Sequence, residues 1–279
     1  MRNLRPRATI LMVAVAASVV IATPSAALGA NADTSHGSIP AAVDGSGWLR
    51  LGHLSPDTKA VDVRLTALSG GSVVLELSDV GYGDVSPYQT LPQGTYTVSM
   101  IPAGSGDWDQ VAISDTVEVS ASTASTVAAY GPTASLQLRA FDDDLTSPSA
   151  GSGRIRLIQA STVSPAVDVQ TSTGVTIAEK ARSGTATAYT DVPAGAWDLS
   201  LTGVGVTGTA TVDVPVGSVS TLFILDTADG GLTILPVLDS AGAGVVPIGG
   251  VDTGGGWLAG STAGEAPRLG VIRAGSAAV

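Results

Sequence analysis

Apolar and polar residues alternate along several short stretches of this chain. Leu49 and Leu51, and then Val61, Val63 and Leu65, are separated by polar or small neighbours. A period of two is typical of half-buried β-strands, because successive side chains of a strand point to opposite faces. Outside the N-terminal segment, no stretch has the i, i+3, i+4 apolar spacing of an amphipathic helix. The pattern therefore predicts an all-β chain, with further strands in the first half over 73–77, 91–100, 117–119, 126–130 and 136–141.

The same pattern returns about 100 residues later. Residues 50–63 (RLGHLSPDTKAVDV) recur without a gap at 156–169 (RLIQASTVSPAVDV), with 7 of the 14 positions identical. The Pro-x-Gly-x-aromatic turn at 92–96 recurs at 193–197, and in both places a tyrosine precedes the proline by four residues. A repeat of this length is typical of a small domain rather than a solenoid unit. We expect two tandem antiparallel β-sandwiches, immunoglobulin-like or prealbumin-like.

The N-terminal segment has the three parts of a secretory signal peptide. Three arginines within residues 1–7 precede an apolar run over 8–22, and small residues follow. The run is short for a membrane span, although an uncleaved anchor is the alternative. We therefore expect a secreted or cell wall-associated protein without an integral span in its mature chain; whether a C-terminal anchor was lost stays open. The expected boundaries are a signal peptide 1–32, a linker 33–47, a first sandwich 48–144, a linker 145–153, a second sandwich 154–239 and a Gly-rich disordered tail 240–279.

The composition of the chain excludes several kinds of partner and site. The chain has 13 basic and 24 acidic residues, a formal net charge of −11, and no cysteine. A surface this acidic repels phosphate backbones, so nucleic acid is not an expected partner. The absence of cysteine excludes disulfides, thiolate metal sites and a cysteine nucleophile.

Few residues of the chain suggest catalysis. Of the two histidines, His36 lies in the predicted linker, and His53 shares strand parity with Leu49 and Leu51. Because the second copy has Gln159 at the position of His53, hydrogen bonding is a better interpretation than proton transfer. His53 and Asp57 are too few to hold zinc. We predict no enzymatic activity, no metal and no cofactor.

Several charged residues have two interpretations. Asp62 and Asp168 lie between two valines in both copies, where each accepts a hydrogen bond from a neighbouring loop or pairs with Arg50 or Arg156 across strands. The run 142–144 is interpreted as a solvated interdomain linker rather than a Ca²⁺ site. Three arginines form an anion patch or, more simply, the solvated face of a sheet; they are Arg50, Arg64 and Arg139.

One loop suggests ligand binding. Trp108 lies in a Gly-rich loop between Asp107 and Asp109, and an exposed indole beside carboxylates is suited to stacking on a sugar ring. The speculative ligand-binding set is Trp108, Asp107, Asp109, His53 and Asp57.

The segment 53–63 (HLSPDTKAVDV), together with Tyr88 and the turn LPQGTY at 91–96, resembles the domain of unknown function 4397 family. The resemblance covers about residues 48–141, with a diverged second copy to about 238. It implies an exported bacterial envelope protein and supplies no catalytic residues. We expect a non-enzymatic structural or adhesive role, with cell-wall polysaccharide or another envelope protein as the partner. The alternatives are a glycan- or ligand-binding module that uses loops of the first domain, and a hydrolase with a carboxylate cleft between the domains.

Overall fold

The computed structural model describes residues 45–241, and almost every element in them is a β-strand. The predicted all-β sandwich class is confirmed. The expected signal peptide (1–32), most of the expected linker (33–47) and nearly all of the expected tail (240–279) lie outside the described residues. Within residues 45–241, no helix is long and apolar enough to cross a membrane.

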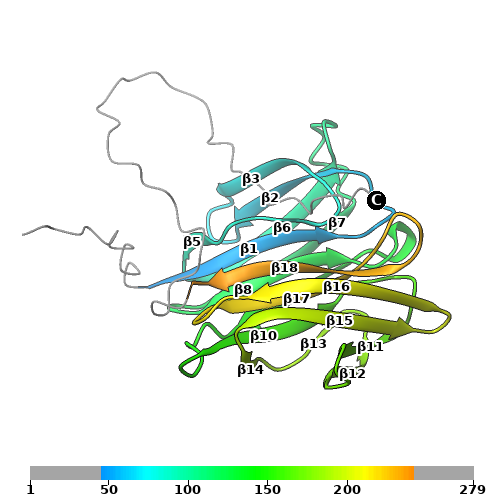
Figure 1. Cartoon of the computed structure of the whole chain (residues 1–279). Helices are drawn as coiled ribbons and strands as arrows, with labels where there is room; N and C mark the ends of the chain where they lie inside the picture. Colours follow the sequence, from blue (N-terminus) through cyan, green and yellow to red (C-terminus); the bar gives the residue numbers. More distant parts are fainter. Residues whose placement is uncertain (1–44, 242–279) are drawn as a thin grey trace, which may run out of the picture. The chain divides into compact units, whose positions relative to one another are not determined.

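The N-terminal half of the described chain forms two facing sheets (Figure 1). One sheet has the order β4-β1-β8-β9, with β5 also paired to β1, and the other has the order β3-β2-β6-β7. A short 3₁₀ turn, Thr133–Ser135, precedes the last strand. The strands are β1 Ser46–Leu54, β2 Val61–Ala67, β3 Val73–Val80, β4 Asp84–Val85, β5 Gln89–Pro92, β6 Gly94–Pro102, β7 Ile113–Val119, β8 Ala124–Tyr130 and β9 Gln137–Asp143.

The C-terminal half follows the same strand order. Strands β13, β10, β17 and β18 correspond to β4, β1, β8 and β9, while β12, β11, β15 and β16 correspond to β3, β2, β6 and β7. A single parallel bridge, Gly208 to Leu232, connects the two layers into one nine-stranded sheet. The strands are β10 Ser152–Gln159, β11 Ala166–Thr171, β12 Thr176–Arg182, β13 Thr185–Ala186, β14 Thr190–Pro193, β15 Gly195–Gly203, β16 Val206–Val214, β17 Val219–Asp226 and β18 Leu232–Ser240.

The pairing is not antiparallel throughout. In each half the first strand runs parallel to the eighth, β1 beside β8 over seven residue pairs and β10 beside β17 over six. The bridge between β16 and β18 is also parallel, and every other strand pair within residues 45–241 is antiparallel. The first strand of each half is therefore an interior strand of its sheet, with hydrogen-bonded neighbours on both sides.

Each half has its own apolar core, and the predicted alternation accounts for it. In β2 the valines at 61 and 63 and the leucine at 65 are buried, while the residues between them are only partly buried. The equivalent core of the C-terminal half contains Val167 and Val169. The period-two pattern thus correctly predicts which side chains face the inside of each sandwich.

The second face of β1 departs from the expected pattern. All nine residues of β1 and all seven of β8 are buried, and so are all eight residues of β17. Part of the outer face of these strands joins neighbouring strands in one apolar cluster, which includes Leu54 and Phe141 from the N-terminal half and Phe223 and Val237 from the C-terminal half. The faces predicted to be solvated are instead buried, because each half covers the other.

Glycine is required where β1 and β10 begin. A Cβ atom on Gly47 would lie 2.3 Å from the carbonyl oxygen of Ser120, and one on Gly153 would lie 2.3 Å from a methyl carbon of Val214. Real Cβ atoms do not approach that closely, so both positions are restricted to glycine. The polar, Gly-rich composition of residues 33–47 predicts that Gly47 belongs to the linker, but its backbone pairs with Leu91 in β5.

Candidate functional site

A buried arginine of each half reaches a carboxylate of the other half. Arg50 in β1 is 1% exposed, and its Nη2 atom lies 2.6 Å from Oδ1 of Asp239 in β18. Arg156, at the matching position of β10, donates to the buried carboxylate of Asp143 in β9. The two ion pairs are reciprocal: β1 pairs with the end of β18, and β10 pairs with the end of β9.

Threonine and tyrosine side chains complete this network in the same way on both sides. The Nε atom of Arg50 donates to Thr126 (2.8 Å), and that of Arg156 donates to Thr221 (3.0 Å). The two threonines donate in turn to the carboxylates of Asp143 and Asp239. Two tyrosine rings lie against the guanidinium groups, at 4.6 Å for Tyr88 with Arg50 and 4.7 Å for Tyr189 with Arg156. We call these eight residues the interface network.

Burial and charge fix the protonation of this network. Burial is the largest single effect and opposes the charge of Arg50, but the carboxylate of Asp239, together with Tyr88, Asp143 and Tyr189, outweighs it, so the pKa of Arg50 lies above its ordinary value. Burial raises the pKa of Tyr88 well above its usual value, and burial likewise raises that of Tyr189. Both phenols therefore stay protonated and donate, Tyr88 to Asp143 and Tyr189 to Asp239. Oδ1 of Asp239 has only its ion pair with Arg50, and no other buried side-chain polar atom of the network lacks a hydrogen-bond partner. A buried ion pair requires such partners to offset its loss of hydration.

The structure decides three interpretations drawn from the sequence. Asp143 is a buried strand residue rather than part of a solvated linker, because the C-terminal half covers the end of β9. Arg50 and Arg156 do not pair with Asp62 and Asp168; their partners lie across the interface. Nor do three arginines form an anion patch: Arg50 is buried, Arg64 pairs with Glu76, and Arg139 donates to the carbonyl of Gly184.

Asp62 and Asp168 accept hydrogen bonds from the segments beside them, which is the first of the two interpretations given for these residues. Asp62 accepts hydrogen bonds from the backbone N–H groups of Asp79 and Gly104, both at 2.9 Å. Asp168 accepts one from Lys180 at 2.7 Å. Asp79 and Lys180 both have positive φ angles, of 56° and 47°, at irregular points of the β2–β3 and β11–β12 pairs. The repeated Val-Asp-Val segment therefore secures a strained bulge in each half.

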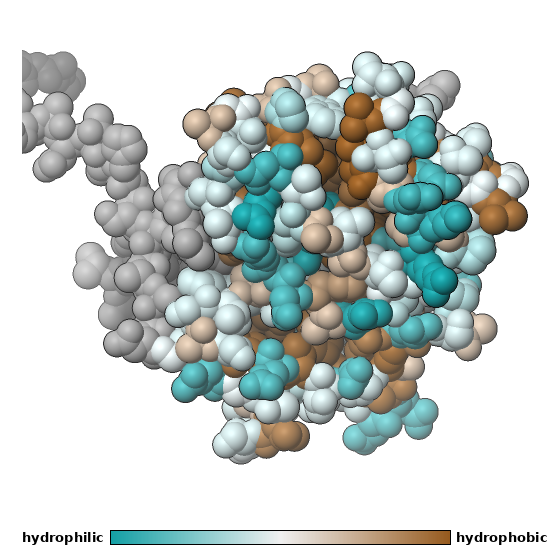
Figure 2. Space-filling model, turned by 90° about the horizontal axis from the view of Figure 1, so that it is seen from below, coloured by the Kyte–Doolittle hydropathy of each residue, from teal (hydrophilic) through white to brown (hydrophobic). Residues whose placement is uncertain are grey.

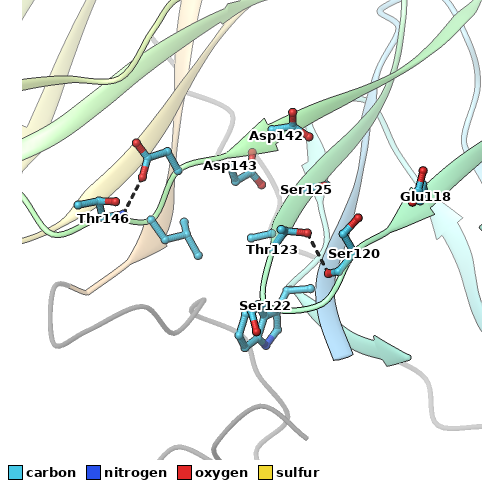
Figure 3. A pocket seen from close by; sticks show the side chains of 12 residues that line it. Glu118, Ser120, Ser122, Thr123, Ser125, Asp142, Asp143 and Thr146 are labelled. Atoms are coloured by element: carbon cyan, nitrogen blue, oxygen red, sulfur yellow. Dashed lines mark hydrogen bonds between the residues drawn. The ribbon is translucent and has the colours of Figure 1, made fainter. Parts of the chain in front are cut away.

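A pocket of about 510 Å³ lies next to the interface network, and Asp143 belongs to both. Figure 3 shows Asp142 and Asp143 of β9 close to the loop between β7 and β8, which carries Ser120, Ser122 and Thr123. The hydroxyl of Thr123 donates to the carbonyl of Ser120, which holds this loop. We call it the Asp143 pocket. Its other lining residues are Trp48, Glu118, Ala124, Ser125, Asp144, Leu145 and Thr146.

His53 and Asp57 do not belong to either the network or this pocket. His53 is 1% exposed, and its Nε2 atom lies 3.3 Å from the carbonyl oxygen of Lys59. Gln159 makes the matching bond, from Nε2 to the carbonyl of Ser164. Burial lowers the pKa of His53, and the neutral Nε2–H tautomer can donate this bond. The carboxylate of Asp57 accepts from the backbone N–H of Thr133, and this bond lowers its pKa.

Trp108 is partly buried, and the guanidinium carbon of Arg64 lies 3.8 Å from the centre of its ring. The exposed Asp107 accepts a hydrogen bond from the backbone N–H of Asp109 within the same loop. The structure therefore brings Trp108, Asp107 and Asp109 together in one loop but covers a face of the indole. It does not bring these three residues together with His53 or Asp57. Within residues 45–241, no three histidine or carboxylate side chains gather in a way that could hold a metal ion.

Sequence reasoning missed the interface network, although the signal was present. Arginine, threonine, tyrosine and aspartate recur at matching strand positions of the two halves, but only the arginines keep the 106-residue spacing of the ungapped repeat, and the tyrosines are 101 residues apart. The threonines and aspartates are separated by 95 and 96 residues rather than 106. Aligning the copies strand by strand recovers all four pairs.

Comparison with known proteins bears on the N-terminal half most directly. The family model described as "Domain of unknown function (DUF4397)" matches residues 47–170. These residues belong to the DUF4397 family. The resemblance noted in the sequence is confirmed, and the match extends from β1 through most of β11, so that it includes Arg50, Asp143 and Arg156.

Other comparisons add little to the DUF4397 assignment. A search of curated proteins gave no match. Among solved structures, the chain is similar to the Bacillus anthracis TIE protein, with 12% identity, a TM-score of 0.23, and coverage of 71% of this chain and 42% of that one. It is also similar to a leucine-rich repeat protein from Bacteroides thetaiotaomicron, with 14% identity, a TM-score of 0.22, and coverage of 63% and 26%. This chain therefore spans less than half of either protein, and similarity at this level carries no argument about function.

Proposed function

We propose that this chain is an exported, non-enzymatic protein of the bacterial cell envelope, with a structural or adhesive role. In this proposal the two halves are copies of one module that act as a single rigid body. The observation that carries it is the interface network, in which Arg50 pairs with Asp239 and Arg156 pairs with Asp143. Because both pairs are buried and reciprocal, they fit only one docking geometry of the halves.

A rigid body suits an interaction role, because neither half can turn without exposing buried charge. Sliding one half past the other would leave Arg50 and Asp239 without partners, which costs several kcal/mol for each ion (about 3–5 kcal/mol when one partner is removed). The apolar cluster around Phe141 and Phe223 adds to this constraint. The carboxylates Asp57, Asp62 and Asp168 are engaged in local backbone hydrogen bonds.

Export and interaction can be tested with the full-length chain. We expect the tagged chain, expressed in a Gram-positive host, to appear in the wall fraction or the medium and to be degraded when intact cells are treated with protease. Retention in the cytoplasm would contradict export. The exported chain should then sediment with isolated cell walls, and a chain that stays in the supernatant would contradict the interaction role.

The Asp143 pocket favours a second candidate, a glycan-binding module in the N-terminal half. Its serine and threonine hydroxyls can exchange hydrogen bonds with sugar hydroxyls, and Glu118, Asp142 and Asp144 supply acceptors. The carboxylates would disfavour an anionic polymer, so the pocket suits a neutral or amino sugar. Loops of the first domain were the predicted location for such a site, although Trp108 does not line the pocket.

A matched pair of charge reversals tests the glycan site. Glu118 and Asp213 occupy equivalent positions beside β6 and β15, and both are exposed, but only Glu118 lines the pocket. We expect Glu118→Lys to weaken retention on a neutral wall polysaccharide and Asp213→Lys to leave it unchanged. Equal retention of both variants would exclude the pocket as the binding site.

A further inference from the structure

The β2–β3 hairpin and its counterpart β11–β12 differ in length, and a second cavity lies beside the shorter one. In the N-terminal half, 20 residues run from Val61 to its cross-strand partner Val80. In the C-terminal half, only 15 residues run from Val167 to its partner Ala181. The β11–β12 hairpin is therefore five residues shorter than the β2–β3 hairpin. The missing part includes the pairing position that Ala67 occupies in the N-terminal half, opposite the aromatic residue Tyr96 of β6.

The effect is clear at Tyr96 and its counterpart Trp197. Tyr96 pairs with Ala67 at the end of β2 and is 4% exposed. In the C-terminal half, pairing between β11 and β15 ends at Thr171 and Leu199, two residues before Trp197 is reached. Trp197 is consequently only partly buried, although its Nε1–H still donates to Pro193 as the hydroxyl of Tyr96 does to Pro92.

A cavity of about 460 Å³ lies under this uncovered position. Its floor is formed by the buried core side chains Ile155 and Leu157, while Val175, which also lines it, is 57% exposed. Figure 2 views the molecule from below the orientation of Figure 1, and shows apolar side chains in recesses framed by hydrophilic ones on that face. We call the cavity of about 460 Å³ the Trp197 cavity. Its apolar lining residues include Ile155, Leu157, Val175, Ile177, Val192 and Trp197.

The chemistry of the rim selects the kind of ligand. The hydroxyls of Thr176 and Thr190 line the cavity and make no hydrogen bond within the described part of the chain. Asp191 also lines it, and hydrogen bonds from Ser149 lower the pKa of its carboxyl group, so the rim carries a negative charge at neutral pH. An anionic head group would be repelled there, whereas a hydroxylated uncharged head can bond to the threonines.

We propose that the Trp197 cavity binds a single alkyl or acyl chain that carries an uncharged, hydroxyl-bearing head group. The chain lies on the apolar floor and against the indole of Trp197, and the head lies at the threonine rim. A volume of several hundred Å³ with an apolar floor and a few polar rim groups is typical of small-molecule sites. In the N-terminal half the longer hairpin covers the equivalent position, so the site belongs to the C-terminal half alone.

Monomeric alkyl glucosides with six, eight and ten carbons are suitable probes, measured by calorimetry with the full-length chain. We expect saturable binding that tightens about fourfold for each added methylene. Val175→Glu places a charge in the apolar lining and should weaken binding at least about tenfold. Val216→Glu is the matched control, because Val216 is also an exposed valine (68%) but does not line the cavity.

Three results would overturn the proposal. The first is the absence of saturable binding, and the second is an equal effect of Val175→Glu and Val216→Glu. The third concerns the head group: decanoate that binds as tightly as decyl glucoside would contradict the role of the acidic rim. Because both substituted valines are exposed, neither variant depends on repacking of the core, and circular dichroism of the two variants should match that of the parent chain.

Discussion

Replacing Arg50 by methionine tests whether the interface network holds the two halves together. The substitution leaves the carboxylate of Asp239 buried without its cation, since that side chain is fully enclosed. Breaking a buried ion pair in this way costs about 3–5 kcal/mol. This is a large part of the total stability of a typical protein, which is about 5–15 kcal/mol. We expect the free energy of unfolding, measured by urea denaturation, to fall by that amount.

Two further variants separate the ion pair from other effects of the substitution. Arg64→Met breaks the partly exposed pair with Glu76, and should cost about 1 kcal/mol or less. The double variant Arg50→Met with Asp239→Leu removes both charges and should recover most of the loss, because no ion is left unpaired. We also expect Arg50→Met to lower the slope of the urea transition, since the halves would then unfold separately. A loss of stability in Arg50→Met no larger than that in Arg64→Met would refute a stabilising role of the buried ion pair.

Two other perturbations probe single positions. Burial lowers the pKa of His53, so the unfolded chain binds the proton more readily than the folded chain does. The free energy of unfolding therefore decreases as the pH falls below the unperturbed value of about 6.5, by up to about 1.4 kcal/mol per pH unit. His53→Gln, which copies Gln159, should remove this part of the pH dependence. If the urea midpoint shifts equally between pH 7.5 and pH 5.5 in the parent chain and in His53→Gln, this role of His53 is contradicted. Gly184→Ala should destabilise the chain by more than about 1 kcal/mol, because φ is +73° there and a Cβ atom would lie 2.4 Å from the hydroxyl of Tyr130 across the interface. An unchanged thermal midpoint would show that the interface accommodates the methyl group.

Much of each sandwich could be predicted from local patterns. The alternation at Val61, Val63 and Leu65 correctly identifies the core face of β2, because the side-chain period of a strand depends only on backbone geometry. The Pro-x-Gly-x-aromatic turn is equally local, and its aromatic residue bonds back to the proline carbonyl in both halves. The parallel pairing of β1 with β8 could not be predicted, since it joins strands separated by some 70 residues and leaves no periodic signal.

The candidate sites were harder to predict than the strands. The loop around Trp108 predicts an exposed indole, but the guanidinium of Arg64, which is distant in sequence, lies against its ring. The Asp143 pocket combines a loop after β7 with the end of β9, and the Trp197 cavity depends on the length of a hairpin rather than on any motif. Neither cavity has a contiguous sequence signature, because its walls come from segments that meet only after folding.

By itself, the sequence determined that this protein is all-β and that its second half repeats the strand pattern of its first. It also determined that the first copy carries the residues of the DUF4397 signature. Those properties depend on near neighbours along the chain and on backbone periodicity. Only the tertiary structure decided which faces are buried. Arg50, Arg156 and Asp143 have the sequence context of solvated residues, yet each is buried because the other half covers it. The physical reason is that a charge on the outer face of a strand is buried only when another surface covers and pairs with it. That surface is built from residues distant in the sequence.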